Sequence, residues 1–251
     1  MLDIKDYRKV LSIIRDDKPL IHSITNIVVA NITANFALAL GASPIMASYV
    51  GEIREIVTMA DVLLLNIGTI TKEQFESMKV AAKTAKLNHK RVVLDPVGVG
   101  VSKFRSYVTQ YFLEEGLIDI VKGNYSEILK IAGERIQQRG VDSCEHERSR
   151  VEEALAYISR KHNIVVAATG DIDFITDGEN YEKLVGGNIL LTKITGSGCM
   201  AAMSVAIFLS RCQPFKSAVY GLYTIKTVSS RIDADGPTEF YTKFIDSIYN
   251  L

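Results

Sequence analysis

Short runs of apolar residues alternate along the chain with longer segments in which apolar residues recur every three or four positions. The short runs are mostly Val, Ile and Leu without polar alternation, as expected of parallel strands that helices cover on both faces. They predict strands at Pro44–Ser48, Val62–Asn66, Val92–Asp95, Ile118–Val121 and Ile164–Ala168. Strand–helix alternation of this kind predicts right-handed crossovers and an α/β fold with a doubly wound, mostly parallel sheet and helices on both faces.

The segments between these runs predict helices. Ile27–Leu40 is followed by Gly41, a residue typical of the position after a helix. Thr71–Leu87 begins with a threonine that can cap it, and Ser126–Ala132 is followed by Gly133. We therefore expect at least three helices, each between two strands, to pack on the sheet.

The later part of the chain has a different pattern. Asp177-Gly178 separates the short runs Phe174–Thr176 and Tyr181–Leu184 and predicts a hairpin. From Gly198 onward the pattern is almost entirely helical. The polar segment Glu134–Glu153 predicts an exposed loop that enters a surface helix. No segment has the composition of a linker or an internal repeat, so residues 1–251 are expected to form one domain.

Composition excludes several classes of protein. The 29 basic and 29 acidic residues give a net charge of zero, which argues against a nucleic-acid or membrane-surface protein. The three cysteines are too scattered for a disulfide framework or a zinc cluster. The charged N-terminal segment lacks the apolar region of a signal peptide, and the longest near-apolar run, Cys199–Leu209, is too short to span a membrane. We therefore expect a cytoplasmic protein with reduced thiols.

The strongest chemical signal is Thr195-Gly196-Ser197-Gly198-Cys199, which precedes an apolar helical pattern. Two glycines at a helix start let backbone N–H groups converge on a phosphate or a developing anion, and the helix dipole favours negative charge there. The same potential would favour the thiolate of Cys199. The alternative is a close-packed turn followed by a buried cysteine.

Two further segments follow predicted strands, where α/β sheets bind their ligands. Asp95 directly follows Val92-Val93-Leu94 and is suited to hold a divalent ion, unless it only caps the next turn. After the fourth strand, Lys122 could contact phosphate and Glu127 could hold Mg²⁺. Alternatively, Asn124 and Glu127 form a capping box at the next helix.

Other polar residues are less informative on their own. Asn26 belongs to a polar cluster at the opening of a predicted helix, and Met46 lies in a strand reached through a small-residue turn. A methionine is more often part of a core than a ligand contact. The histidines are dispersed, and no GxSxG motif occurs. A nucleophilic pair of Cys199 and His22 is possible on paper.

Taken together, these segments resemble the hydroxyethylthiazole kinases, ribokinase-like enzymes of thiamin salvage. The resemblance covers nearly the whole chain and is carried, in order, by PLIHSITNIVVANITANFALALGASPIMA, LLLNIGT, VVLDPVGVGVSKFR, VKGNYSEI, GVDS, VAATGDIDFITDG and LTKITGSGCMAA. It implies a ribokinase-like fold and ATP-dependent phosphorylation of the alcohol of 4-methyl-5-(2-hydroxyethyl)thiazole. It also implies a homotrimer with active sites between subunits.

The resemblance also implies roles for single residues. Met46 and Gly196 would contact the thiazole, with Asn26 nearby, whereas Lys122 and Thr169 would contact ATP. Mg²⁺ would lie at the NxxE motif of Asn124 and Glu127, with Asp95 as an acidic companion; the backbone of Gly196, Ser197, Gly198 and Cys199 would form the anion hole. Cys199 would orient the substrate hydroxyl or act as a weak general base.

This sequence departs from the pattern in one position that matters for phosphate binding. The residue before Gly123 is often Arg in that family, and Lys122 keeps the charge but loses the bidentate hydrogen bonding of Arg. Many ribokinase-like kinases also have Asp where this chain has Cys199, a cysteine that the thiazole kinases share. Alternatives are a hydroxymethylpyrimidine kinase, an ATP-dependent hydro-lyase that repairs damaged nucleotides, and a non-catalytic relative that binds a small ligand.

Overall fold

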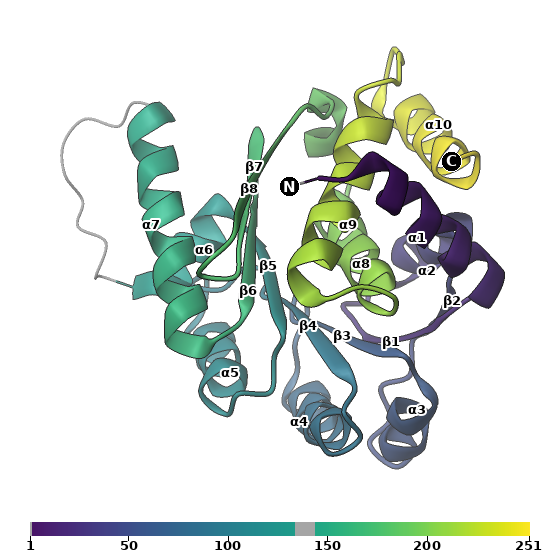
Figure 1. Cartoon of the computed structure of the whole chain (residues 1–251). Coiled ribbons are helices and arrows are strands. Elements are labelled where there is room, and N and C mark those ends of the chain that lie inside the picture. Colours follow the sequence, from purple (N-terminus) through teal and green to yellow (C-terminus); the bar gives the residue numbers. More distant parts are fainter. Residues whose placement is uncertain (1, 134–143) are drawn as a thin grey trace.

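One sheet organises the part of the chain that the computed structural model describes, residues 2–133 and 144–251 (Figure 1). Its strand order is β2-β1-β3-β4-β5-β6-β7-β8. Neighbouring strands are parallel from β2 to β6, and the pairs β6–β7 and β7–β8 are antiparallel. The strands are β1 (Leu20–Ile24), β2 (Ser43–Ile45), β3 (Val62–Asn66), β4 (Arg91–Asp95), β5 (Ile120–Asn124), β6 (Val165–Thr169), β7 (Ile172–Thr176) and β8 (Tyr181–Val185). The predicted α/β class is confirmed.

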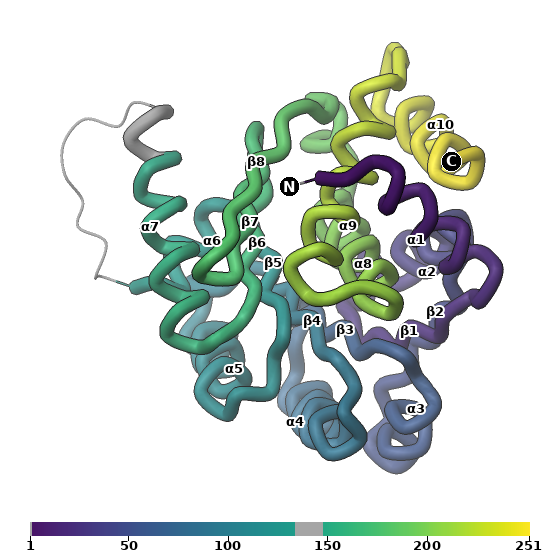
Figure 2. The backbone as a smooth tube through the Cα atoms, in the orientation of Figure 1, coloured from purple at the N-terminus to yellow at the C-terminus, as the bar shows by residue number. Residues whose placement is uncertain are grey.

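Helices cover both faces of this sheet because successive strand residues point to opposite sides. In β3, Val62 and Leu64 pack into one core, and Leu63 and Leu65 pack into the other. The first core lies under α1 (Ile4–Asp17), α2 (Ala30–Leu40), α8 (Ser197–Leu209), α9 (Pro214–Ser229) and α10 (Pro237–Tyr249). The second lies under α3 (Ile53–Met59), α4 (Lys72–Leu87), α5 (Lys103–Glu114), α6 (Tyr125–Ala132) and α7 (Cys144–His162). Figure 2 shows the first and last helices on the same side of the molecule.

Helix α8 has apolar residues on all of its faces, and the structure buries all of them. Every residue from Cys199 to Leu209 is buried, and the helix packs between the sheet and its neighbours α2 and α9. A helix with this pattern needs an interior position. This packing fixes the orientation of the helix, whose N-terminus lies at the carboxyl ends of the strands (Figure 1).

Local signals located the ends of several elements. Thr71 caps α4 by accepting a hydrogen bond from the Gln74 N–H, and Gly41 follows α2 with a φ of 106°. The predicted hairpin at Asp177-Gly178 joins β7 to β8. The expected loop within Glu134–Glu153, and with it the GVDS segment, lies largely outside the described residues; α7 follows it as expected.

Some predicted strand limits were wrong. The strand predicted at Ile118–Val121 is β5, which begins at Ile120 and continues to Asn124. Its polar end pairs with β6, where Lys122 aligns with Ala167 and Asn124 with Thr169. Asp119, before β5, instead accepts hydrogen bonds from Arg91 Nη1 and the Val92 N–H. Pairing with neighbouring strands, rather than the local apolar run, therefore sets the ends of this strand.

Candidate active site

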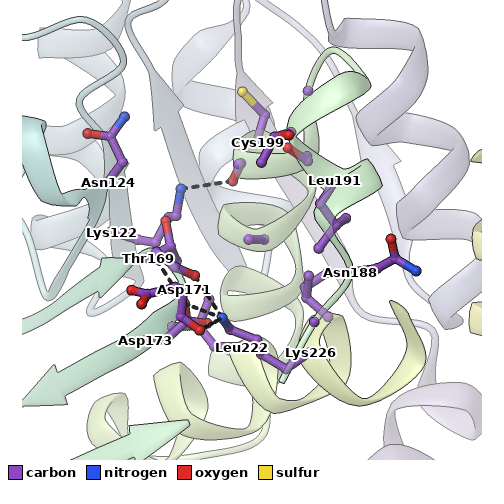
Figure 3. Close-up of a pocket in the computed structure, with 18 of the residues that line it drawn as sticks. Lys122, Asn124, Thr169, Asp171, Asp173, Asn188, Leu191, Cys199, Leu222 and Lys226 are labelled. Carbon is purple, nitrogen blue, oxygen red and sulfur yellow. Dashed lines mark hydrogen bonds and ion pairs between the residues drawn. The ribbon is translucent and has the colours of Figure 1, made fainter. Parts of the chain in front are cut away.

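A cavity of about 740 Å³ opens at the carboxyl ends of the central strands. Figure 3 shows its polar side chains converging from several elements. Asp95 comes from the end of β4, Lys122 from β5, Thr169 from the end of β6 and Cys199 from the first turn of α8. This is where parallel α/β sheets bind ligands. The structure thus brings together residues that the sequence suggested separately.

The N-terminus of α8 forms one wall of the cavity. Gly196 precedes the helix with a φ of 87°, a left-handed conformation that favours glycine. A Cβ at this position would lie 3.0 Å from Val29 Cγ1. The first N–H groups of a helix have no acceptor within it, and the helix dipole adds positive potential. The segment Gly196–Cys199 therefore has the geometry of an anion site.

Lys122 supplies positive charge beside this helix start. Its side chain is buried, and its Nζ donates to the Gly198 carbonyl oxygen at 3.1 Å. It lies 4.0 Å from Asp95 Oδ1. A Cβ on Gly198 would come within 3.2 Å of Nζ. The glycine thus allows the ammonium group to approach the backbone at the start of α8.

Asn66, at the end of β3, connects the polar groups of the site. Its Nδ2 donates to Asp95 Oδ2 at 2.6 Å and to Cys199 Sγ at 3.1 Å. Its Oδ1 accepts from Asn26 Nδ2 at 2.7 Å and from the Gly68 N–H at 3.0 Å. All four hydrogen-bonding positions of this buried amide are therefore used. Asn66 was not predicted as a site residue. The available signal was its position directly after the apolar run of the LLLNIGT segment, at the end of a strand.

The thiol of Cys199 is not activated by the helix start. Burial and the neighbouring Asp95 carboxylate together raise its pKa to about 12, against the opposing effect of Lys122. The expectation that the helix dipole favours the thiolate is therefore wrong, because loss of solvent and a nearby negative charge both stabilise the thiol. Burial also raises the pKa of Asp95 to about 7, with Lys122 opposing and Glu127 reinforcing the shift. Asn66 Nδ2 lies between the two groups, because it donates to both Asp95 Oδ2 and Cys199 Sγ.

Glu127 lines the cavity and also caps α6. Its Oε2 accepts from the Asn124 N–H at 2.8 Å, while Asn124 Oδ1 accepts from the Glu127 N–H at 2.9 Å. This is the capping box that the sequence allowed as an alternative. Its Oε1 accepts from the Gly98 N–H at 2.9 Å. The carboxylate therefore holds the turn after β4 next to the start of α6.

Asn26 and Met46 do not line this cavity in their own chain. Asn26 is buried one step behind it, where Nδ2 lies 3.8 Å from Cys199 Sγ. Met46, expected within the strand Pro44–Ser48, instead lies just after β2, which ends at Ile45, and it is half-buried against the first core. His22 is not paired with Cys199, because its Nε2 lies 2.9 Å from the Ala47 carbonyl oxygen. That contact anchors the segment after β2.

Three charged residues of the cavity wall, Asp171, Asp173 and Lys226, were not predicted from the sequence. Lys226 on α9 and Asp173 on β7 form an ion pair at 3.2 Å, and both side chains are buried. A lysine within the apolar pattern of a buried helix was the available signal. The partner could not be found this way, because Asp173 belongs to a distant part of the chain.

The described residues contain neither a cluster of metal ligands nor a membrane-spanning helix. Across residues 2–133 and 144–251, no group of three or more His, Cys, Asp or Glu side chains is arranged to hold a metal ion. None of the helices in those ranges is long and apolar enough to span a membrane.

Comparison with known proteins gives a consistent result. The hydroxyethylthiazole kinase family matches residues 11–251. A hydroxyethylthiazole kinase of Thermoanaerobacter pseudethanolicus is 39% identical over 97% of this chain and 94% of its own length. One of Pyrococcus furiosus is 40% identical over 96% and 91%, respectively.

Solved structures agree in fold. The hydroxyethylthiazole kinase protein of Pyrococcus horikoshii has a TM-score of 0.89 and 35% identity, with 99% of this chain and 94% of that chain covered. An ADP complex of Bacillus subtilis pyridoxal kinase has a TM-score of 0.64 at 15% identity, with 86% and 93% covered. This second similarity concerns the fold alone.

Proposed function

The chain belongs to the hydroxyethylthiazole kinase family, and from this membership we propose that it transfers a phosphoryl group from ATP to the alcohol of 4-methyl-5-(2-hydroxyethyl)thiazole in thiamin salvage. The observation that supports this most directly is the convergence of Asp95, Lys122 and the start of α8 on one cavity. Phosphoryl transfer depends mainly on positioning and on neutralising charge. A carboxylate, an ammonium group and free backbone N–H groups are suited to that task.

We assign the two substrates to different parts of the site. ATP would place its phosphates between Lys122, Thr169 and the first turn of α8. There the N–H groups of Gly196–Cys199 would donate hydrogen bonds to the oxygens of the transferred phosphoryl group. The thiazole alcohol would approach Cys199. Since the thiol stays protonated near neutral pH, Cys199 would orient the alcohol rather than remove its proton. The alcohol would lose its proton late in a loose transition state, to an oxygen of the transferred phosphoryl group, so little basicity is needed from the protein.

Mg²⁺ fits this donor set. Asp95 and Glu127 line the same cavity, and the charge of Glu127 contributes to the raised pKa of Asp95. Two carboxylates and several waters are the usual surroundings of Mg²⁺ in phosphoryl-transfer sites. When bound, the ion would neutralise charge on the ATP phosphates. Asp95 Oδ1 and Glu127 are the groups that would hold its waters.

The decisive experiment measures ADP release from Mg-ATP with hydroxyethylthiazole, hydroxymethylpyrimidine and ribose as parallel acceptors. Turnover with the thiazole alone supports the proposal. Turnover with the pyrimidine instead would identify the protein as a hydroxymethylpyrimidine kinase. If none of the three reacts and the folded protein binds a nicotinamide nucleotide tightly, a hydro-lyase replaces the kinase. The names of the relatives do not favour that alternative.

The role of Glu127 in metal binding can be separated from its role as a helix cap. In Glu127→Gln the half-saturating Mg²⁺ concentration is expected to rise several-fold, because an amide is a weaker ligand for Mg²⁺ and its waters than a carboxylate. The free energy of unfolding should fall by about 0.5–1.5 kcal/mol, because the amide keeps one acceptor oxygen where the carboxylate accepts from both the Asn124 and the Gly98 N–H. A Mg²⁺ titration of the rate and thermal denaturation measure the two effects.

Thr71→Ala is the matched control, since Thr71 caps α4 away from the cavity. It should lose similar stability and keep the wild-type Mg²⁺ requirement. A Glu127→Gln variant whose Mg²⁺ titration equals that of the wild type would leave Glu127 with its capping role only.

We propose that the chain assembles as a homotrimer in which a neighbouring subunit completes the thiazole site. Asn26 and Met46 follow adjacent parallel strands, and exposed apolar side chains accompany both. Ile27 is 82% exposed, and Tyr49 is 70% exposed. Such neighbouring apolar surface is typical of subunit contacts. Contact there would bring Met46 of one subunit toward the cavity of another.

Tyr49→Glu is expected to shift the protein from trimer toward monomer in sedimentation velocity, because a charge would be buried at the contact. The thiazole KM should rise in parallel. Leu87→Glu is the control, since Leu87 is 78% exposed at the end of α4. An unchanged sedimentation coefficient for Tyr49→Glu would place the contact elsewhere.

A further inference from the structure

Lys226 is a buried cation in the wall of the cavity that the mechanism above does not use. It lies on α9 with 6% of its surface exposed, between residues that pack against the sheet. Burial of an ammonium group is costly unless acceptors surround it. Its contacts therefore indicate what it does.

Lys226 Nζ makes two hydrogen bonds and one ion pair (Figure 3). Nζ donates to the carbonyl oxygens of Gly170 at 2.8 Å and Asp171 at 2.9 Å. Asp173 Oδ1 lies 3.2 Å from Nζ and forms an ion pair with it. The ammonium group is therefore surrounded by two carbonyl oxygens and a carboxylate of the protein itself. Lys226 thus acts on the protein rather than on the ligand.

These contacts hold the tight turn between β6 and β7. Asp173 Oδ1 also accepts from the Gly170 N–H at 3.0 Å, so the ion pair binds both backbone groups of Gly170. The residue before this turn is Thr169, whose Oγ1 donates to the Gly123 carbonyl oxygen at 3.2 Å. Thr169, Gly170 and Asp171 all line the cavity.

The stem of Lys226 also contacts a second segment of the wall. Gly187 has a φ of 97°, and a Cβ there would lie 3.2 Å from Lys226 Cδ. Gly187 and its neighbours between β8 and the 3-10 helix η2 (Ile189–Lys193) line the same cavity. One side chain therefore lies between two loops that come from different parts of the chain.

We propose that Lys226, with Asp173, is a positioning residue for the nucleotide: it fixes the Gly170-Asp171 turn and thereby the Thr169 end of the site. The inference rests on the proposed function, in which ATP lies at Thr169. The acceptor alcohol lies at the other end of the cavity, beside Cys199. Loss of the ammonium group therefore weakens ATP binding and leaves thiazole binding intact.

The test compares Lys226→Met with the double variant Lys226→Met/Asp173→Asn. The single variant leaves Asp173 buried without its cation, so both its thermal stability and its ATP affinity should fall. The double variant removes the unpaired charge, and its stability should recover. Its ATP KM should stay roughly 10- to 100-fold above wild type, because the Gly170 and Asp171 carbonyl groups still lack their donor and the turn is misplaced. The thiazole KM should equal that of the wild type in both.

Lys216→Met is the matched control on the same helix, since Lys216 is exposed and pairs with Asp6 outside the cavity. ADP binding by calorimetry, without any acceptor, repeats the comparison independently of turnover. Wild-type ATP KM and ADP affinity in the double variant would overturn the proposal, as would equal increases in the KM of both substrates. If the wild-type protein phosphorylates no thiazole yet binds ADP, the proposed function fails, and the calorimetric comparison alone then decides the role of Lys226.

Discussion

Asp95→Asn is expected to lower kcat/KM by roughly 10²–10³-fold, the scale on which losing one preorganised electrostatic group slows an enzyme. Asp95 is 1% exposed, lies 4.0 Å from Lys122 Nζ and accepts from Asn66 at 2.6 Å. Asparagine has nearly the same shape and can still accept from Asn66. The substitution therefore removes mainly the charge that would hold the Mg²⁺ waters. Steady-state kinetics at saturating Mg²⁺ measure the loss.

Folding must be checked, because the variant leaves the buried Lys122 without its carboxylate neighbour. Circular dichroism and ADP affinity show whether the cavity is intact. Asp246→Asn is the control, since Asp246 is exposed on α10. A folded Asp95→Asn protein with wild-type kcat/KM would exclude Asp95 from the reaction.

Cys199→Ala is expected to lower kcat by about 10²-fold, at the low end of the effect of a general acid or base, because the thiol orients the alcohol without removing its proton. The ATP KM should change little, since the phosphates are assigned to Lys122 and the helix start. Cys199→Ser should keep more activity than the alanine variant, because a hydroxyl group can replace the thiol in its contacts with Asn66 and Asp95.

The pH–rate profile distinguishes this role from that of a thiolate base. With its pKa raised to about 12, the thiol stays protonated at neutral and mildly alkaline pH. Cys199→Ala should therefore lower the whole profile between about pH 6 and pH 9 without removing a limb from it. Loss of an ascending limb would instead identify a thiolate base. Cys212→Ala, a half-buried cysteine outside the cavity, should match the wild type. An unchanged rate in Cys199→Ala would remove Cys199 from the mechanism.

Several elements could be predicted because their signals are local. Val62–Asn66 is apolar enough to be a strand covered on both sides, and it agrees with β3. The Asn124–Glu127 capping box depends on residues three positions apart. The helix α1 lies outside the predicted elements, although its buried residues Tyr7, Val10, Leu11 and Ile14 follow helical spacing.

The strand β1 is harder to predict from its residues. His22 and Ser23 are fully buried within it, and neither His22 Nδ1 nor Ser23 Oγ has a hydrogen-bond partner in the described structure. Polar side chains of this kind interrupt the apolar run that identifies a central strand. Pairing with β2 and β3 places the segment in the sheet despite them.

The sequence by itself determined the α/β class, the C-terminal ends of α2, α4 and α6, and the residue types that meet at the carboxyl ends of the strands. These depend on interactions between residues a few positions apart and on a general property of parallel sheets. Only the tertiary structure decided that Asn66 would bind a thiol 133 positions away and that Lys226 would pair with Asp173. It also reversed the expected effect on the Cys199 thiol, because a pKa depends on burial and on charges brought near by folding.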